Sequence, residues 1–200
     1  MWSERFVDPD TAGAHYFDEV WGDSTGSMIQ MYPPEWNWSR PAKDLLVVEI
    51  TAEWCGAYCE GGTGHYHYDL RDGSRVYFDS LFTKDELEQV KRLVGERWRV
   101  VIGKHLAALQ DSSQRLPTEA SSDWWIGAIE LYEQCLQERA NEDPYVGDMV
   151  ITRESVSALV SRCSVHADMA LDDLMDVEVP LSREELALWM RPEALKLLGW

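Results

Sequence analysis

The stretch that decides the fold is GHYHYDLRDGSRVYFDSLFTKDE, residues 64–86. In its first part, histidine alternates with tyrosine. Because side chains alternate along a strand, this pattern predicts a strand with His65 and His67 on one polar face and the tyrosines on the other. RDGS contains the Asp-Gly dipeptide that is typical of a hairpin turn, and RVYFDSLF predicts the returning strand. The segment therefore favours an antiparallel hairpin.

A further strand is predicted before this hairpin. DLLVVEITAEW, residues 44–54, alternates after an apolar start, which indicates a half-buried strand. Its predicted faces carry Val48, Ile50 and Ala52 on one side and Val47, Glu49 and Thr51 on the other. We expect CGAYCEGGTG, residues 55–64, to be a loop, because its glycines permit positive φ.

Two helices are predicted after the hairpin. Thr83 and Glu86 form a capping-box pattern, and apolar residues at spacings of three or four follow it. Pro117 and its polar neighbours end this helix, and a second helix begins near Ser122 and ends before residues 140–148.

The last part of the chain predicts strands again. DMVITRESVSALVS, residues 148–161, indicates a strand, a turn and a strand, and MDVEVPLS, residues 175–182, another strand. Ser182 with Glu185 begins a short helix that Pro192 limits. The sequence therefore predicts an α+β fold with a mostly antiparallel sheet: a hairpin, two central helices, C-terminal strands and a short helix.

Residues 1–44 are predicted to form an irregular, tryptophan-rich segment that packs on or near a domain of residues 45–200. It contains YPPEWNWSRP, residues 32–41, whose three prolines exclude a regular helix. Tryptophan covers apolar surface well, but it is also prominent among the residues that anchor protein interfaces. Both roles are open for this segment.

The charge is strongly acidic, with a formal net value of −18. Such a field repels phosphate backbones, so we expect no nucleic-acid partner. It steers the protein toward a basic partner, although acidity also serves solubility. No apolar run is long enough for a signal peptide or a membrane span, so the sequence as written predicts a cytoplasmic protein without a membrane partner.

The four cysteines are Cys55, Cys59, Cys135 and Cys163. In a reducing cytosol all four would be thiols. In an exported protein, Cys55 could pair with Cys59 across the glycine-rich turn, and the other two could pair with each other. The sequence leaves the thiol state open.

YDLRDGSRVYFDSLFTKDEL, together with MVITRESVSALV and VEVPLSREELALWMRP, resembles the domain of unknown function found at the C-terminus of the anti-sigma factor RsiV and in some peptidoglycan deacetylases. The resemblance covers roughly residues 45–192. It implies an α+β fold that binds lysozyme, a small basic protein, and that has no established catalytic residues. We expect no cofactor.

Two chemical alternatives remain for the histidines. Cys55, Cys59, His65 and His67 would make a Cys₂His₂ set, and zinc favours these ligands. Their spacing differs from common zinc-finger spacings, and strand alternation already explains the histidines, so we favour a structural role without a metal.

Acidic pairs such as Asp172 with Asp173 are expected to be solvated.

No motif of a hydrolase, a metalloprotease, a phosphate loop or a dinucleotide site occurs, which predicts a protein without enzymatic activity. The leading hypothesis is a module that neutralises a basic protein, most concretely a bacterial immunity protein against a toxin. Its alternatives are an envelope lysozyme-binding domain and a zinc-binding or hydrolytic protein. The predicted partner-binding residues are Trp36, Trp38, Trp54, Tyr58, Glu60, Asp69 and Asp72.

Overall fold

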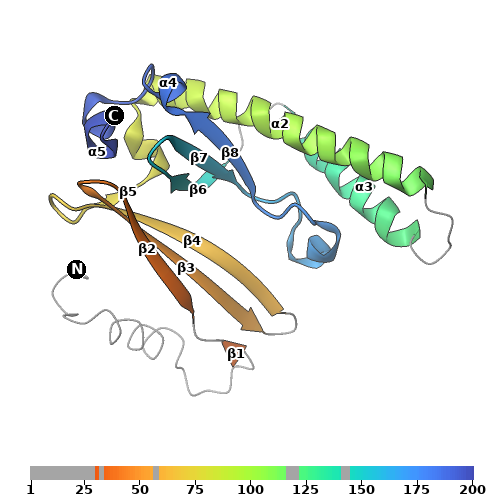
Figure 1. The fold of residues 1–200 in the computed structure, drawn as a ribbon. Helices are drawn as coiled ribbons and strands as arrows, with labels where there is room; N and C mark the ends of the chain where they lie inside the picture. Colours follow the sequence, from red (N-terminus) through yellow and green to blue (C-terminus); the bar gives the residue numbers. More distant parts are fainter. Residues whose placement is uncertain (1–29, 32–33, 56–58, 116–121, 141–144) are drawn as a thin grey trace. The chain divides into compact units, whose positions relative to one another are not determined.

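The computed structural model describes residues 30–31, 34–55, 59–115, 122–140 and 145–200. The chain forms two compact units, one of residues 1–35 and 51–63 and the other of residues 36–50 and 64–200. The predicted α+β class with antiparallel sheets is confirmed (Figure 1).

The first sheet consists of β1 (Gln30–Met31), β2 (Glu35–Ala42), β3 (Leu45–Cys55), β4 (Cys59–Asp69) and β5 (Arg75–Val76). Its order is β1-β3-β4-β5, and β2 also pairs with β3. Within the first unit, Gln30 and Met31 pair with the end of β3, and the Thr51 and Thr63 hydroxyls are 2.9 Å apart.

Two predictions for this sheet are wrong in detail. Residues 59–64 belong to β4, so the expected loop is shorter. Residues 35–42, expected to be irregular, form β2, and Pro41 lies near its end, where an edge strand tolerates a missing N–H. The half-buried strand is predicted without a choice between its faces, and on β3 the face with Leu45 and Val47 is the buried one.

The returning strand of the hairpin is also shorter than predicted. It ends at Val76, and the 3₁₀ helix η1 (Phe78–Leu81) follows. In a strand, residues 78 and 81 would point to opposite faces. A 3₁₀ turn brings positions i and i+3 to the same side, which allows Phe78 and Leu81 both to enter the core.

The two predicted helices are confirmed as α2 (Lys84–Arg115) and α3 (Ser122–Glu138). They pack against each other, and α2 also contacts β8 of a second sheet (Figure 1). The second sheet is antiparallel, in the order β6 (Val146–Ile151), β7 (Ser155–Val160) and β8 (Val177–Ser182). Trp98 and Tyr132, one from each helix, are among the largest side chains in the core.

The C-terminal part combines confirmed and corrected predictions. Ser182 and Glu185 form the expected capping box of α4 (Arg183–Leu186). Pro192 does not limit this helix; it begins α5 (Pro192–Leu198), since the first helical turn needs no proline N–H. Cys135 of α3 forms a disulfide with Cys163, which precedes the 3₁₀ helix η2 (His166–Leu171).

Candidate functional site

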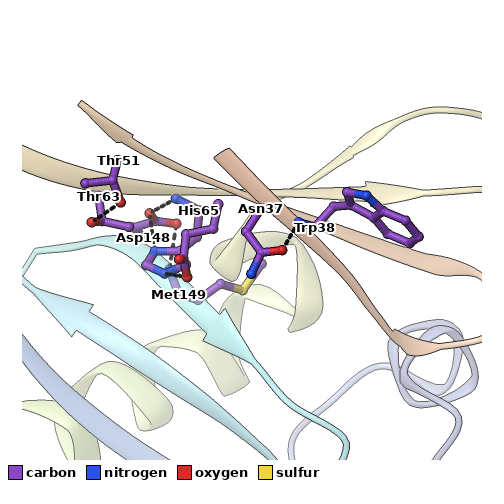
Figure 2. A network of polar contacts seen from close by, with 8 residues as sticks. Asn37, Trp38, Thr51, Thr63, His65, Asp148 and Met149 are labelled. Atoms are coloured by element: carbon purple, nitrogen blue, oxygen red, sulfur yellow. Dashed lines mark hydrogen bonds and ion pairs between the residues drawn. The ribbon is translucent and has the colours of Figure 1, made fainter. Parts of the chain in front are cut away.

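Two exposed tryptophans mark one side of β2. Trp36 is 53% exposed and Trp38 is 59% exposed, and because they are two residues apart on a strand, they point to the same side. The side chain of Asn37, between them, accepts a hydrogen bond from the backbone N–H of Trp38 at 2.8 Å (Figure 2). Both side chains are therefore accessible from solvent, and their role in partner binding stays a prediction.

The other predicted partner-binding residues divide into three groups. Asp72 is exposed at the hairpin turn and accepts a hydrogen bond from the backbone of Ser74. Asp69 is only 7% exposed, because its carboxylate pairs with Arg71; its predicted surface role is wrong. The side chains of Trp54, Tyr58 and Glu60 lie outside the described residues.

His65 lies between two carboxylates. Its backbone N–H donates to Oδ2 of Asp148 on β6 at 2.8 Å, and its ring Nδ1 is 3.3 Å from the same oxygen (Figure 2). Its Nε2 is 3.5 Å from Glu49 on β3. The backbone N–H of Asp69, on the same edge of β4, donates to Ser74. Since β5 ends at Val76, it offers no carbonyl opposite His65, and Asp148 takes that place.

His67, the second histidine of the pair, is 1% exposed and pairs with Val76 of β5. Its Nε2 has no hydrogen-bond partner. The two histidines share one face of β4, as predicted. This face points inward, so the expectation of a polar surface face is wrong. The four side chains Glu49, His65, His67 and Asp148 are called the histidine cluster below.

The pKa values of the two histidines in this cluster are shifted in opposite directions. The hydrogen bond to Asp148 raises the pKa of His65 against the opposing effect of burial. Burial lowers the pKa of His67 to about 4. Burial alone would raise the pKa of Asp148, but its hydrogen bonds with the ring and backbone of His65 outweigh that effect, so the pKa is lowered. Near neutral pH, His67 is therefore neutral, and His65 keeps its proton to a higher pH than a free histidine does.

A zinc site at these histidines finds no support in the geometry. Both ring nitrogens of His65 already face carboxylates, and the side chains of Cys55 and Cys59 lie outside the described residues. Within the part of the chain that the structure describes, no group of three or more His, Cys, Asp or Glu side chains is arranged to hold a metal ion.

A second polar cluster joins α2, α3 and the segment before β8. The Tyr132 hydroxyl lies 2.8 Å from Asp172 and 2.9 Å from Asp173, and it accepts a hydrogen bond from the backbone N–H of Leu174. His105 contacts Asp173 at 2.8 Å. We call Tyr132, Asp172, Asp173 and His105 the tyrosine cluster.

The tyrosine cluster was missed by sequence reasoning, which expected both aspartates to be solvated. Asp172 is buried, and its second oxygen accepts a hydrogen bond from the backbone N–H of Ser164 at 2.8 Å. Burial is the main reason why the pKa of Tyr132 is strongly raised. The hydroxyl therefore stays protonated and acts as the hydrogen-bond donor to the aspartates. No local signal marks Asp172, because its partner lies 40 residues earlier in the chain.

A hollow of about 660 Å³ lies where the β6–β7 turn, β8 and α4 meet. Its charged lining consists of equal numbers of arginines and glutamates, namely Arg97, Arg153, Arg183, Glu154, Glu184 and Glu185. Arg97 is already paired with Glu185. The hollow therefore favours neither sign of charge.

Exposed negative charge gathers along α3 and the segment that follows Cys163. Helix α3 and residues 163–182 contain no lysine or arginine, and Trp124 of α3 donates a hydrogen bond to the backbone of Ala170 in η2. The exposed acidic side chains of the two segments are Asp123, Glu130, Glu133, Glu138, Asp173, Asp176 and Glu178.

The fold occurs in solved structures. A crystal structure of a DUF3298 family protein from Pseudomonas aeruginosa PAO1 aligns with a TM-score of 0.54 at 10% identity, over 92% of this chain and 70% of that chain. A DUF3298 family member from Bacteroides fragilis NCTC 9343 aligns with a TM-score of 0.49 at 16% identity, over 96% and 67% of the two chains. No family model and no curated protein matches the sequence.

At 10% identity, the first alignment shows a shared fold and nothing about function. The resemblance to a domain of unknown function is confirmed at this level, and the relation to the RsiV domain itself stays a prediction. Among the described residues, no helix combines the length and the apolar character needed to cross a membrane.

Proposed function

We propose that this protein is a non-enzymatic module that binds a basic protein. The observation that carries the proposal is the exposure of Trp36 and Trp38 on one side of β2. Large aromatic side chains that remain exposed side by side are typical of binding surfaces, and tryptophan is the residue type most enriched among interface hot spots.

The charge supports a basic partner. A net charge of −18 accelerates encounter with a cationic protein, and the exposed acidic side chains of α3 and residues 163–182 concentrate part of that charge. By covering a basic active-site cleft, such a module would neutralise its partner, as an immunity protein does with a toxin.

Envelope lysozyme recognition is the second candidate, and the Cys135–Cys163 disulfide favours it. Disulfides persist in oxidising compartments and are rare in a reducing cytosol. Mass spectrometry of protein alkylated inside the native cells separates the two candidates. A thiol state of Cys135 and Cys163 supports the cytoplasmic immunity role, and a disulfide supports the envelope role.

The proposal is tested by calorimetric titration of the full chain with lysozyme and with a panel of basic toxins, using an acidic protein of similar size as the control. We expect one basic protein to bind, with an affinity that falls as the salt concentration rises. Absence of binding to every basic protein at low ionic strength contradicts the proposal, as does hydrolytic activity toward a panel of substrates.

A further inference from the structure

Strand β2 lies at the edge of its sheet. Among the residues that the structure describes, β2 pairs with β3 and with no other strand. Residues 35–40 are all exposed, so no other element covers either face of the strand there. The outer edge of such a strand presents backbone N–H and C=O groups that another strand can pair with.

This edge lacks the features that usually prevent pairing with another chain. Proteins protect edge strands by keeping them very short or by placing lysine or proline on them. The opposite edge strand of the same sheet, β5, is only two residues long. Residues 36–40 contain neither lysine nor proline, and Pro41 comes only after them. The edge of β2 is therefore suited to accept a further strand.

The sequence of β2 is complementary to itself in an antiparallel pairing. Since side chains alternate, Trp36, Trp38 and Arg40 lie on one side of the strand. If two copies pair with Trp38 opposite the same residue of the second copy, each Trp36 lies opposite Arg40 of that copy. Asn37 then lies opposite Ser39. Aromatic pairs directly across two strands are stabilising, and arginine is attracted to the face of tryptophan.

The local charge also permits a second copy at this edge. Two chains that each have a net charge of −18 repel each other. Residues 36–44, however, contain the basic residues Arg40 and Lys43 and a single acidic residue, Asp44. We propose that β2 pairs antiparallel with β2 of a second copy, centred on Trp38, and so forms a symmetric homodimer.

This dimer goes beyond the proposed function and does not depend on it. Residues directly opposite each other in two paired strands point to the same face of the sheet. Trp36 and Trp38 of both copies would therefore gather on one face and stay accessible there. The dimer presents the tryptophans of the proposed binding surface twice rather than covering them.

Sedimentation equilibrium of the full chain, from about 1 µM to about 1 mM, tests the dimer. Pairing through one strand buries little surface, so we expect a weak dimer. Its association should become tighter as the salt concentration rises, because salt screens the repulsion between two acidic chains. Binding of a basic protein should show the opposite salt dependence, which keeps the two proposals distinguishable.

Exchanging charges across the strands tests the register. Trp36→Arg places an arginine opposite Arg40 and should weaken the dimer about tenfold, because the altered pair occurs twice in a symmetric dimer. Combining Trp36→Arg with Arg40→Glu places a carboxylate opposite the introduced arginine and should restore the wild-type affinity. Tyr145→Arg adds the same charge at an aromatic residue that is 77% exposed and lies outside β2, so it is the matched control and should not weaken the dimer.

A chain that stays monomeric over the whole concentration range overturns the dimer. A dimer that Trp36→Arg does not weaken, or that the double substitution does not restore, overturns pairing through β2 in this register. An equal loss in Tyr145→Arg also overturns it, because the effect is then not specific to the strand. Unchanged melting temperatures of the variants exclude loss of folding as the cause.

Discussion

The tyrosine cluster and the histidine cluster both join distant parts of the second unit, but they do so with different chemistry. In the tyrosine cluster, a hydroxyl that keeps its proton meets the buried carboxylate of Asp172, which has a second donor in the backbone of Ser164. In the histidine cluster, the hydrogen bond with Asp148 raises the pKa of His65, and His67 is buried with a ring nitrogen that has no hydrogen-bond partner.

The two clusters therefore differ in how their contacts respond to pH. The Tyr132 hydroxyl keeps its proton near neutral pH, because burial strongly raises its pKa, and the Cys135–Cys163 disulfide crosslinks the same segments. In the histidine cluster, the ring of His65 contacts Asp148 of β6 and His67 is buried, and the pKa values of both rings are shifted. We therefore expect substitution of Tyr132 to act at every pH and substitutions in the histidine cluster to act in defined pH windows.

The largest effect is expected for the disulfide. Replacing Cys135 and Cys163 together by serine opens a loop of 28 residues and should lower the free energy of unfolding by about 3.5 kcal/mol, because the unfolded chain regains its loop entropy. Urea denaturation measures the loss. A loss of similar size at pH 5 and pH 7 fits a permanent link, and a strongly pH-dependent loss contradicts it.

The next effect belongs to His67. Between pH 6.5 and about 4, the unfolded chain binds a proton at this residue and the folded chain does not, so the free energy of unfolding should fall by about 3 kcal/mol as pH falls through this window. His67→Leu keeps a side chain of similar volume in the core and removes the group that titrates. Denaturation curves at pH 7 and pH 4.5 should show a smaller decrease for this variant than for the wild type. Identical decreases would falsify the assignment.

Tyr132→Phe should lower the free energy of unfolding by about 2 kcal/mol, because it leaves the buried Asp172 without one donor and Leu174 without its acceptor. Tyr145→Phe removes an exposed hydroxyl and is the matched control. Urea denaturation of both variants at pH 7 measures the difference. If the two variants are equally stable, the tyrosine cluster contributes nothing to the fold.

Asp148→Asn should produce a smaller change of about 1 kcal/mol, because Asp148 is partly exposed and its contact with His65 is screened. The raised pKa of His65 stabilises the fold fully below pH 6.5, and this contribution is lost as pH rises through the folded value. In the variant, the His65 pKa should move down toward 6.5, as followed by NMR titration of the ring.

Glu49→Gln is expected to have the smallest effect. The contact of Glu49 with His65 is longer, at 3.5 Å, and its side chain is more exposed than that of Asp148. The His65 pKa should therefore move less than in Asp148→Asn. A larger shift in Glu49→Gln would show that Glu49, rather than Asp148, is the main partner.

The parts of the fold that local signals control were predicted well. The capping pair Ser182 and Glu185 begins α4, and the pattern of residues 148–161 gives β6 and β7. These signals succeed because each of them involves neighbouring residues. The burial of Asp69 was missed, since its carboxylate forms an ion pair with Arg71. The short β5 was missed because Phe78 and Leu81 both pack into the core, which a continued strand would not allow.

By itself, the sequence determined the net charge, the ends of the long helices and the alternation that places His65 and His67 on one face of β4. Only the tertiary structure decided that this face points inward and that Asp148, 83 residues away from His65, meets it there. The physical reason is that strand periodicity assigns residues to two faces but carries no information on which face will be covered. That choice depends on segments distant in the sequence, whose packing buries one face and leaves other side chains, such as Trp36 and Trp38, open to solvent.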